Sequence, residues 1–248
     1  MEFADSVVYF LEFFAVNIPV KTRLSDFVSA QLRLVSIVIA LGAVNYMLFK
    51  STGMNLRVFD VGHEQSVPTY FSALNLLLSS VLLWVIYQYE TLSRHKRHNY
   101  WLQLSALLAF LSMDEALSIH ENFKRISDIL ARMGISVFEM ESHRWLPFGL
   151  MLVAVVTVYL IPFLRALPRD TLLLFLASGL VFLTGAIGFE FIGFWMIESG
   201  IVDSKTDIIY LIRRLLEEGF EMYGVALFNC VLYREIVKRK IGLSISTL

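Results

Sequence analysis

The segment "LLLFLASGLVFLTGAIGFEFIGFWMI", residues 172–197, contains a single charged side chain, Glu190. A helix needs about 20 apolar residues to cross the hydrocarbon core of a bilayer. The apolar residues run continuously and do not alternate with polar ones, which favours a helix over a barrel strand. This segment therefore predicts a membrane-spanning helix with a glutamate inside it.

A second glutamate has the same surroundings. "GFEFIG" at residues 188–193 is matched by "GFEMYG" at residues 219–224, so Glu190 and Glu221 follow the same glycine and phenylalanine. At 100° per residue, Ala186 falls on the face of Glu190. Small residues beside an acid allow close approach of another helix in a membrane. We therefore expect two closely packed helices with their acids at one level.

The whole chain is apolar, with 248 residues of which 57% are hydrophobic and 17% charged. This composition is typical of a polytopic membrane protein. The formal net charge is -1 and no basic stripe is present, which gives no support for nucleic-acid binding. The predicted fold is an all-α transmembrane bundle embedded in a lipid bilayer. Its six apolar runs are Leu32–Phe49, Tyr70–Tyr89, Trp101–Glu121, Trp145–Leu164, Leu172–Ile197 and Ile208–Tyr233.

We divide the chain into an amphipathic interfacial segment (residues 1–30), a six-helix transmembrane domain (31–236) and a short basic tail (237–248). The first segment lacks the basic start and the cleavage site of a signal peptide. Its apolar face is formed by Phe3, Val7, Phe10 and Phe14. Cys230 is the only cysteine, so an intramolecular disulfide is excluded.

Basic loops predict the orientation. "RHKRH" at residues 94–98 and "REIVKRK" at residues 234–240 fall on the same side of a six-span protein. Lys and Arg favour the cytoplasmic side. We therefore expect both termini in the cytoplasm, in an inner (plasma) membrane.

The third run ends in acids and a histidine. "SMDEALSIHENF", residues 112–123, contains Asp114, Glu115, His120 and Glu121. Helical spacing puts Asp114 and Glu121 on one face, and Glu115 on another. His120 and Glu121 fit either a polar site or a solvated helix end.

The sixth run places Glu217 and Glu218 one turn before Glu221. Arg213 and Arg214 precede the two glutamates by four residues, the spacing of helical ion pairs. Glu217 and Glu218 therefore have two interpretations, as ion-pair partners or as part of a polar site.

Charged groups inside a membrane normally face a partner, a cavity or a bound ion. Carboxylates with an imidazole suit Zn, Mn, Fe or Mg, and oxygen ligands alone suit Ca or Na. A divalent metal ion is therefore the candidate cofactor. His63 and Glu64 lie in the outer loop, as surface residues unless Pro68 folds the loop over the acids. The candidate ligands are Asp114, Glu115, His120, Glu121, Glu190, Glu218 and Glu221.

Four stretches resemble a family of uncharacterised bacterial multipass membrane proteins. They are "DVGHEQSVPTYFS", "LSMDEALSIHENF", "GAIGFEFIG" and "LEEGFEMYGVALF", which include DExxxxHE and EExxE motifs, and the resemblance covers the chain from about Phe59 to Phe228. The resemblance implies a bacterial membrane protein defined by its acidic motifs, and it implies no activity.

Three functions are compatible with these residues. The first is a cation site used for ion conduction, transport or sensing, in a homo-oligomer because the chain is small for a pore. The second is a metal-dependent intramembrane hydrolase or oxidase acting on a lipid-like substrate. The third is a membrane assembly or signalling partner whose buried ion pairs are structural. The sequence favours the first and a protein that is not an enzyme.

Overall fold

A computed structural model describes residues 16–17, 23–93, 98–119, 146–241 and 244–245. Nearly all of these residues are helical. Two-residue strands β1 (Val16–Asn17) and β2 (Ser244–Ile245) pair in antiparallel orientation near the two ends of the chain. The predicted all-helical class is therefore confirmed apart from this short pairing.

The described residues form six long helices. Three of them, Leu24–Thr52, Val67–Leu92 and Arg169–Glu198, have the length and apolar composition to cross a membrane, which indicates a membrane protein. A 3-10 turn, η1 (Arg57–Phe59), lies between the first two. The six are α2 (Leu24–Thr52), α3 (Val67–Leu92), α4 (His98–Leu117), α6 (Leu146–Leu164), the continuous helix α7 (Arg169–Leu183), η2 (Thr184–Phe189) and α8 (Glu190–Glu198), and α9 (Ile208–Lys238).

Each predicted apolar run overlaps one helix, but the ends differ. α2 begins at Leu24, inside the segment predicted as interfacial. Of the rest of that segment, only Val16, Asn17 and Arg23 are among the described residues. α4 ends at Leu117 and not at Glu121, because Ser118 has a φ of 53°. A left-handed residue ends a helix.

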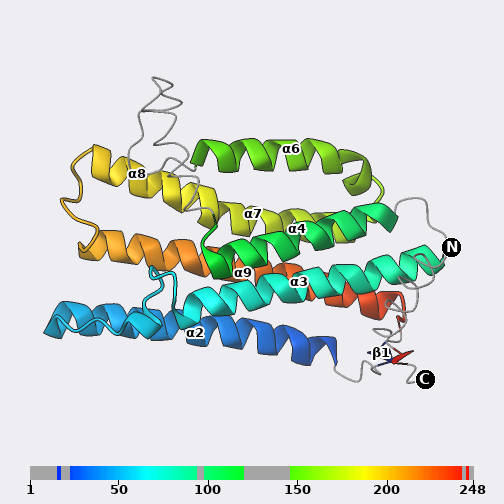
Figure 1. Ribbon diagram of the computed structural model, residues 1–248, viewed down its shortest axis with the longest axis horizontal. Helices are drawn as coiled ribbons and strands as arrows, with labels where there is room; N and C mark the ends of the chain where they lie inside the picture. The colour runs from blue at the N-terminus through cyan, green and yellow to red at the C-terminus, as the bar shows by residue number, and fades with distance from the viewer. Residues whose placement is uncertain (1–15, 18–22, 94–97, 120–145, 242–243, 246–248) are drawn as a thin grey trace, which may run out of the picture.

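The helices lie side by side along the long axis, with α9 in the middle (Figure 1). α9 packs against α2, α3, α7, η2 and α8. Successive helices run in alternating directions, so α2, α4 and α7 begin at the end where α3, α6 and α9 finish. This end, which includes Arg234 to Lys240, is called the basic end, and the other the opposite end.

The surface is apolar and part of the interior is polar. Among the buried side chains are Asn45, Ser79 and Asn229, which are at most 2% exposed. This distribution is expected where lipid surrounds the helices, because polar groups then find partners only inside. One exposed stripe, on α2, consists of Leu34, Ile37, Leu41, Val44 and Met47.

Buried polar side chains join the helices by hydrogen bonds. Between α3 and α4, the Ser80 and Ser105 hydroxyls each donate to the other residue's carbonyl oxygen at 2.8 Å. Between α3 and α9, Ser79 Oγ donates to Asn229 Oδ1 at 2.6 Å, and Asn229 Nδ2 donates to Asn75 Oδ1 at 3.1 Å. Such bonds stabilise helix pairs in membranes, where water offers no alternative partner.

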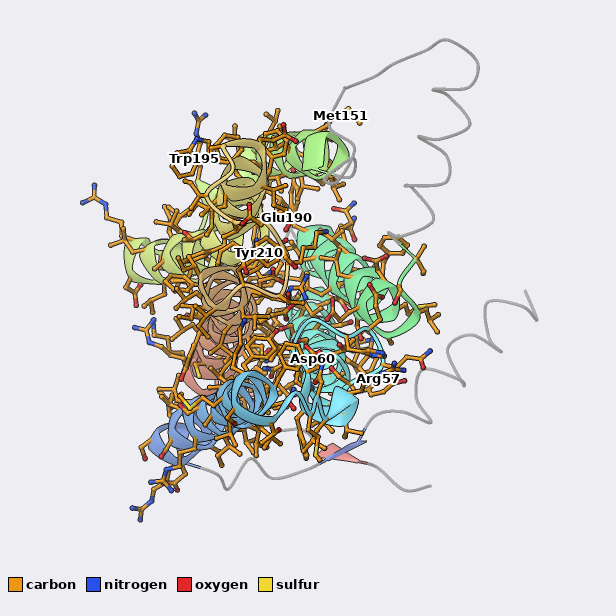
Figure 2. The ribbon with its side chains drawn as sticks, turned by 90° about the vertical axis from the view of Figure 1, so that its left-hand side faces the viewer. Arg57, Asp60, Met151, Glu190, Trp195 and Tyr210 are labelled. Carbon is orange, nitrogen blue, oxygen red and sulfur yellow. The ribbon has the colours of Figure 1, made fainter. Side chains whose placement is uncertain are left out.

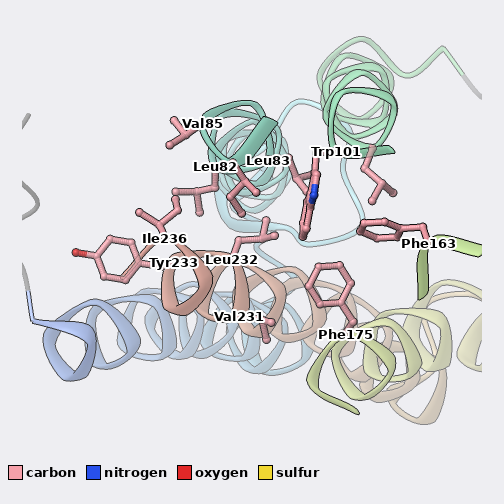
Figure 3. Packing of buried hydrophobic residues seen from close by; sticks show 12 residues of the cluster. Leu82, Leu83, Val85, Trp101, Phe163, Phe175, Val231, Leu232, Tyr233 and Ile236 are labelled. Carbon is pink, nitrogen blue, oxygen red and sulfur yellow. The ribbon is translucent and has the colours of Figure 1, made fainter. Parts of the chain in front are cut away.

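The largest apolar core fills the basic half of the bundle (Figure 3). Trp101 of α4 meets the ring of Phe163 from α6 edge to face, with centroids 4.9 Å apart. Phe175 of α7 packs at a steep angle on Phe163. Leu83 and Leu232, from α3 and α9, are fully buried beside them. Five helices therefore share one close-packed core at this level.

An arginine closes the basic end. Arg239 Nε donates to Glu90 Oε1 at 3.1 Å, and its Nη1 donates to Glu235 Oε2 at 2.8 Å. Its guanidinium lies 5.3 Å from the Trp101 ring centroid, and Thr171 Oγ1 donates to Glu235 Oε1 at 2.7 Å. The basic stretch read as an orientation signal therefore also ties α3, α4 and α7 to α9.

Two glycines allow backbone contact between the fifth and sixth helices. A Cβ added at Gly185 would lie 2.7 Å from the Glu217 carbonyl oxygen and 2.8 Å from the Glu221 nitrogen. A Cβ added at Gly224 would lie 2.6 Å from Phe182 Cα. Contacts this short are not tolerated, and both involve main chain. The predicted close approach at the two glutamates is confirmed.

We predict that Gly185→Ala lowers the thermal unfolding midpoint of the detergent-solubilised protein, because the methyl group forces the η2 and α9 backbones apart. Overpacking of this kind costs roughly 1–3 kcal/mol. The matched control is Gly179→Ala, since a Cβ there meets no atom within 4 Å. Equal midpoints for the two variants, measured by differential scanning fluorimetry, would contradict the proposed backbone contact.

Candidate functional site

Five carboxyl groups gather around the middle of α9. Glu221 lies within electrostatic range of Glu217 and Glu218 on its own helix, Glu115 in the last turn of α4, and Glu190 at the start of α8. These five residues are called the acidic cluster. α9 supplies three of them because Glu217, Glu218 and Glu221 fall within about one helical turn.

Arg213 is the most deeply buried cation of the site, with a side chain that is 4% exposed. Its Nη2 lies 2.7 Å from Glu217 Oε2, and its Nη1 donates to the Phe189 carbonyl oxygen at 2.7 Å. Nη1 also lies 3.5 Å from Glu190 Oε2. The Tyr210 ring centroid is 4.6 Å from the guanidinium carbon. Glu217 is therefore paired with Arg213 at the i,i+4 spacing, as in the first of its two interpretations.

Arg213 serves two carboxyl groups at once. The side chains of Glu190 and Glu217 are also hydrogen-bonded to each other. Gly193 makes room for the arginine, since a Cβ there would lie 2.7 Å from Arg213 Cζ. Viewed from the opposite end, Glu190 and Tyr210 lie towards the middle of the bundle (Figure 2). A three-membered ionic group thus connects α8 to α9.

Arg214 is directed towards α2 and the loop that follows it. Its side chain hydrogen-bonds with Tyr46, whose hydroxyl lies 3.4 Å from Asp60 Oδ1. Gly62 of the loop packs on the arginine, because an added Cβ would lie 2.6 Å from Arg214 Cδ. Arg214 also remains within electrostatic range of Glu218. One guanidinium is therefore divided between the loop and the acidic cluster.

Glu115 differs from its predicted position. Helical spacing separated it from the other acids, yet it lies within electrostatic range of both Glu218 and Glu221. The face assignment assumed a helix continuing to Glu121, whereas α4 ends at Leu117. Glu115, a candidate ligand that helical spacing placed on another face than Asp114, thus lies near the acids of α9.

The segment before Glu190 is a π-helix. η2 (Thr184–Phe189) interrupts the α-helical hydrogen bonding of α7 and α8. In a π-turn, residues five apart lie above one another. The predicted alignment of Ala186 with Glu190 assumed α-helical spacing, and the π-turn changes that spacing by one residue towards Gly185. The sequence of η2 contains two glycines, which are typical of close helix packing. They did not indicate that this turn holds one residue more than an α-helical turn.

The acidic cluster lies level with the start of α3. Asn75 and Asn229 are hydrogen-bonded, and α3 and α9 run in the same direction. Val67 and Glu221 each precede that bond by eight residues, so they lie at similar heights. Glu221 is about 25 Å from the end of α9 at Lys238, at 1.5 Å per residue. Beyond this level α2, α8 and α9 continue further than α3 does (Figure 1).

The other predicted site residues are only partly described. Asp114 lies in the last turn of α4, one residue before Glu115. His63 and Glu64 are half-buried in the loop between α2 and α3. His63 Nδ1 accepts a hydrogen bond from the Gln65 amide at 3.2 Å. His120 and Glu121 lie outside the described residues.

A metal centre is not assembled by the described residues. Within residues 16–17, 23–93, 98–119, 146–241 and 244–245, no group of three or more His, Cys, Asp or Glu side chains has an arrangement that could hold a metal ion. The only histidine among the predicted ligands, His120, lies outside these ranges. The divalent metal and the metal-dependent enzyme therefore stay predictions from the sequence.

The fold and the acidic cluster define an all-helical membrane protein with ionisable groups on its central helix. The chain belongs to the family described as "Domain of unknown function (DUF8692)", whose model matches residues 31–236. This agrees with the resemblance to an uncharacterised family. Searches of curated proteins and of solved structures gave no match.

We predict that Arg213→Met destabilises the protein strongly, because Glu190 and Glu217 lose their shared cation. Breaking a buried pair by removing one partner costs roughly 3–5 kcal/mol. Adding Glu217→Gln should recover part of this loss in a double-mutant cycle measured by thermal unfolding. The control is Arg169→Met, at an exposed position. An unchanged midpoint in Arg213→Met would show that the ionic group contributes little.

Proposed function

We propose that this protein binds a cation at the acidic cluster and uses it for ion conduction, transport or sensing. One observation carries the proposal. Five carboxyl groups come together with two guanidinium groups, and each guanidinium also has another partner, the Phe189 carbonyl for Arg213 and Tyr46 for Arg214. Carboxyl groups away from bulk water are costly unless a positive charge or a proton compensates them. A bound cation removes this excess directly.

The first candidates for the binding atoms are Glu115, Glu218 and Glu221, which would have to move together or be completed by other ligands, because the described arrangement forms no metal-holding group. Glu190 and Glu217 are held by Arg213, whereas Glu218 lies within electrostatic range of Arg214, which also hydrogen-bonds with Tyr46. Oxygen ligands alone favour Na, Ca or Mg. Asp114, His120 and Glu121 are further candidate ligands, and His120 would extend the range to Zn, Mn or Fe.

Six spans are proposed, with the basic end in the cytoplasm of a bacterium. The six long helices alternate in direction, and α9, which carries the most charge, is surrounded by five neighbouring elements. Lys and Arg near the ends of spans favour the cytoplasmic side. The acidic cluster would then open towards the outside, and a homo-oligomer would supply the walls of a pore.

A structural role is the competing function, and the contacts of Arg213 favour it. This arginine holds Glu190, Glu217 and a backbone carbonyl, as a device that locks two helices would. Buried ion pairs of this kind can serve specificity. The two functions differ at Glu218 and Glu221, which a structural lock built on Arg213 does not need.

The test is a cation titration of the purified protein. We predict that one of Na, Mg, Ca, Mn or Zn raises the thermal unfolding midpoint, and that Glu218→Gln and Glu221→Gln remove the effect while the proteins stay folded. A ligand at 100 times its Kd stabilises the native state by about 2.7 kcal/mol. The matched control is Glu198→Gln, an exposed glutamate at the end of α8, which should keep the response.

Flux into proteoliposomes separates binding from transport. Uptake of the stabilising cation that is lost in Glu221→Gln supports conduction or transport, and binding without uptake supports sensing. If none of the five cations shifts the midpoint, and Glu221→Gln merely unfolds the protein, the structural role replaces the proposed function.

A further inference from the structure

In the helix Arg169–Glu198, the spacing of the residues that face α9 changes by one residue at the π-helical segment η2. Up to that point the spacing is regular, with Thr171, Phe175 and Ser178 buried at intervals of four and three residues and Gly185 two turns later. An uninterrupted helix would next bury the fourth residue after Gly185. The structure instead brings Glu190, the fifth, to Arg213. The π-segment therefore decides which residue enters the acidic cluster.

A regular α-helix would present a different face to Arg213. Without the extra residue in the turn, Phe189 and Ile192 would take the places of Glu190 and Gly193. Ile192 has a large side chain where even a single Cβ at Gly193 would lie 2.7 Å from the Arg213 guanidinium carbon. The π-register is thus the one that accommodates this arginine.

The rest of α8 would move with the change of register. In the structure Met196 is 6% exposed and packs with Tyr210, whereas Trp195 is 55% exposed on the outer surface (Figure 2). In the α-register Trp195 would take the place of Met196. The difference between registers is a rotation of about 100° and a shift of about 1.5 Å along the axis. Either face is apolar enough to pack or to meet lipid.

We propose that the helix Arg169–Glu198 is a register switch, in which the π-segment Thr184–Phe189 holds Glu190 on Arg213 in one state and relaxes to α-helix, with Glu190 withdrawn, in the other. Two effects oppose each other. A π-turn is less favourable than an α-turn and recurs at functional sites. The bonds of Arg213 to Glu190 and to the Phe189 carbonyl favour the π-register.

The switch offers a way to couple the acidic cluster to movement. A cation that competed with Arg213 for Glu190 would weaken the bond that holds the π-register, and α8 would rotate. This coupling rests on the proposed function. The existence of two registers does not depend on it. A ligand shifts such an equilibrium only by its difference in affinity for the two states.

Cysteine pairs report the register. In a Cys230→Ala background, Met196→Cys with Tyr210→Cys should cross-link through a short bis-methanethiosulfonate reagent in the π-register, and Trp195→Cys with Tyr210→Cys in the α-register. Glu190→Gln weakens the bond to Arg213 without changing the size of the side chain. We predict that it raises the cross-linked fraction of the Trp195 pair about fivefold, the change for a loss of about 1 kcal/mol.

Deletion of Ile187 is the matched control. It removes the extra residue, so Glu190 becomes the fourth residue after Gly185 and faces Arg213 from a plain α-helix. The deletion should therefore abolish the effect of Glu190→Gln and leave only the Met196 pair cross-linked. If the deletion does not fold, deletion of Gly188 restores the same spacing.

The outcomes separate the two proposals. A Trp195 pair that stays at background in Glu190→Gln, and in Arg213→Lys as a second release variant, overturns the switch, whatever the cation titration shows. A Trp195 pair that rises in both variants supports the switch, even where no cation alters it, and in that case the coupling alone is lost.

Discussion

The arrangement of the opposite end depends on one buried guanidinium. Arg213 leaves α9 towards α8 and meets Glu217, Glu190 and the Phe189 carbonyl within 3.5 Å. No apolar side chain could replace it without leaving two carboxyl groups without their cation. Gly193 next to the guanidinium and the π-turn before Glu190 are both explained by this one requirement. The helix Arg169–Glu198 is π-helical at the point where Arg213 contacts both the Glu190 carboxylate and the Phe189 carbonyl oxygen.

The helices at the basic end are joined in a similar way, by a second arginine. Arg239 is held by Glu90 and Glu235 and lies over Trp101, so one guanidinium touches α3, α4 and α9. Between the two arginines the interactions are neutral, from serine, asparagine and packed aromatic rings. The basic-end pairs are close to complete. Among the described residues, the acidic cluster brings five carboxyl groups near two guanidinium groups.

The sequence predicted the helices well because apolar length and turn signals are local. The runs, the close approach of two helices at small residues beside the glutamates, and the spacing of Arg213 from Glu217 all follow from the pattern along one chain segment. Three features do not follow from the pattern within one segment. Ser118 ends α4 early through its left-handed backbone, η2 inserts a residue, and Arg239 finds Glu90 on another helix. Each depends on contacts between segments, and these contacts cannot be predicted from a periodicity of 100° per residue within one helix.

The composition of α9 leads to a last consequence. α9 is not among the three helices whose composition qualifies them as spans, yet it packs against five neighbouring elements. Its polar residues Arg213, Glu217 and Asn229 are buried, and its outward residues Ile209, Ile212 and Leu216 are apolar and exposed. A central helix surrounded on most sides need not be apolar throughout, provided its charges have partners. Well-packed apolar residues usually replace buried ion pairs without loss of stability. Glu218 and Glu221, which lie outside the Arg213 group, are therefore the acids of α9 whose presence the ion pairs of Arg213 explain least.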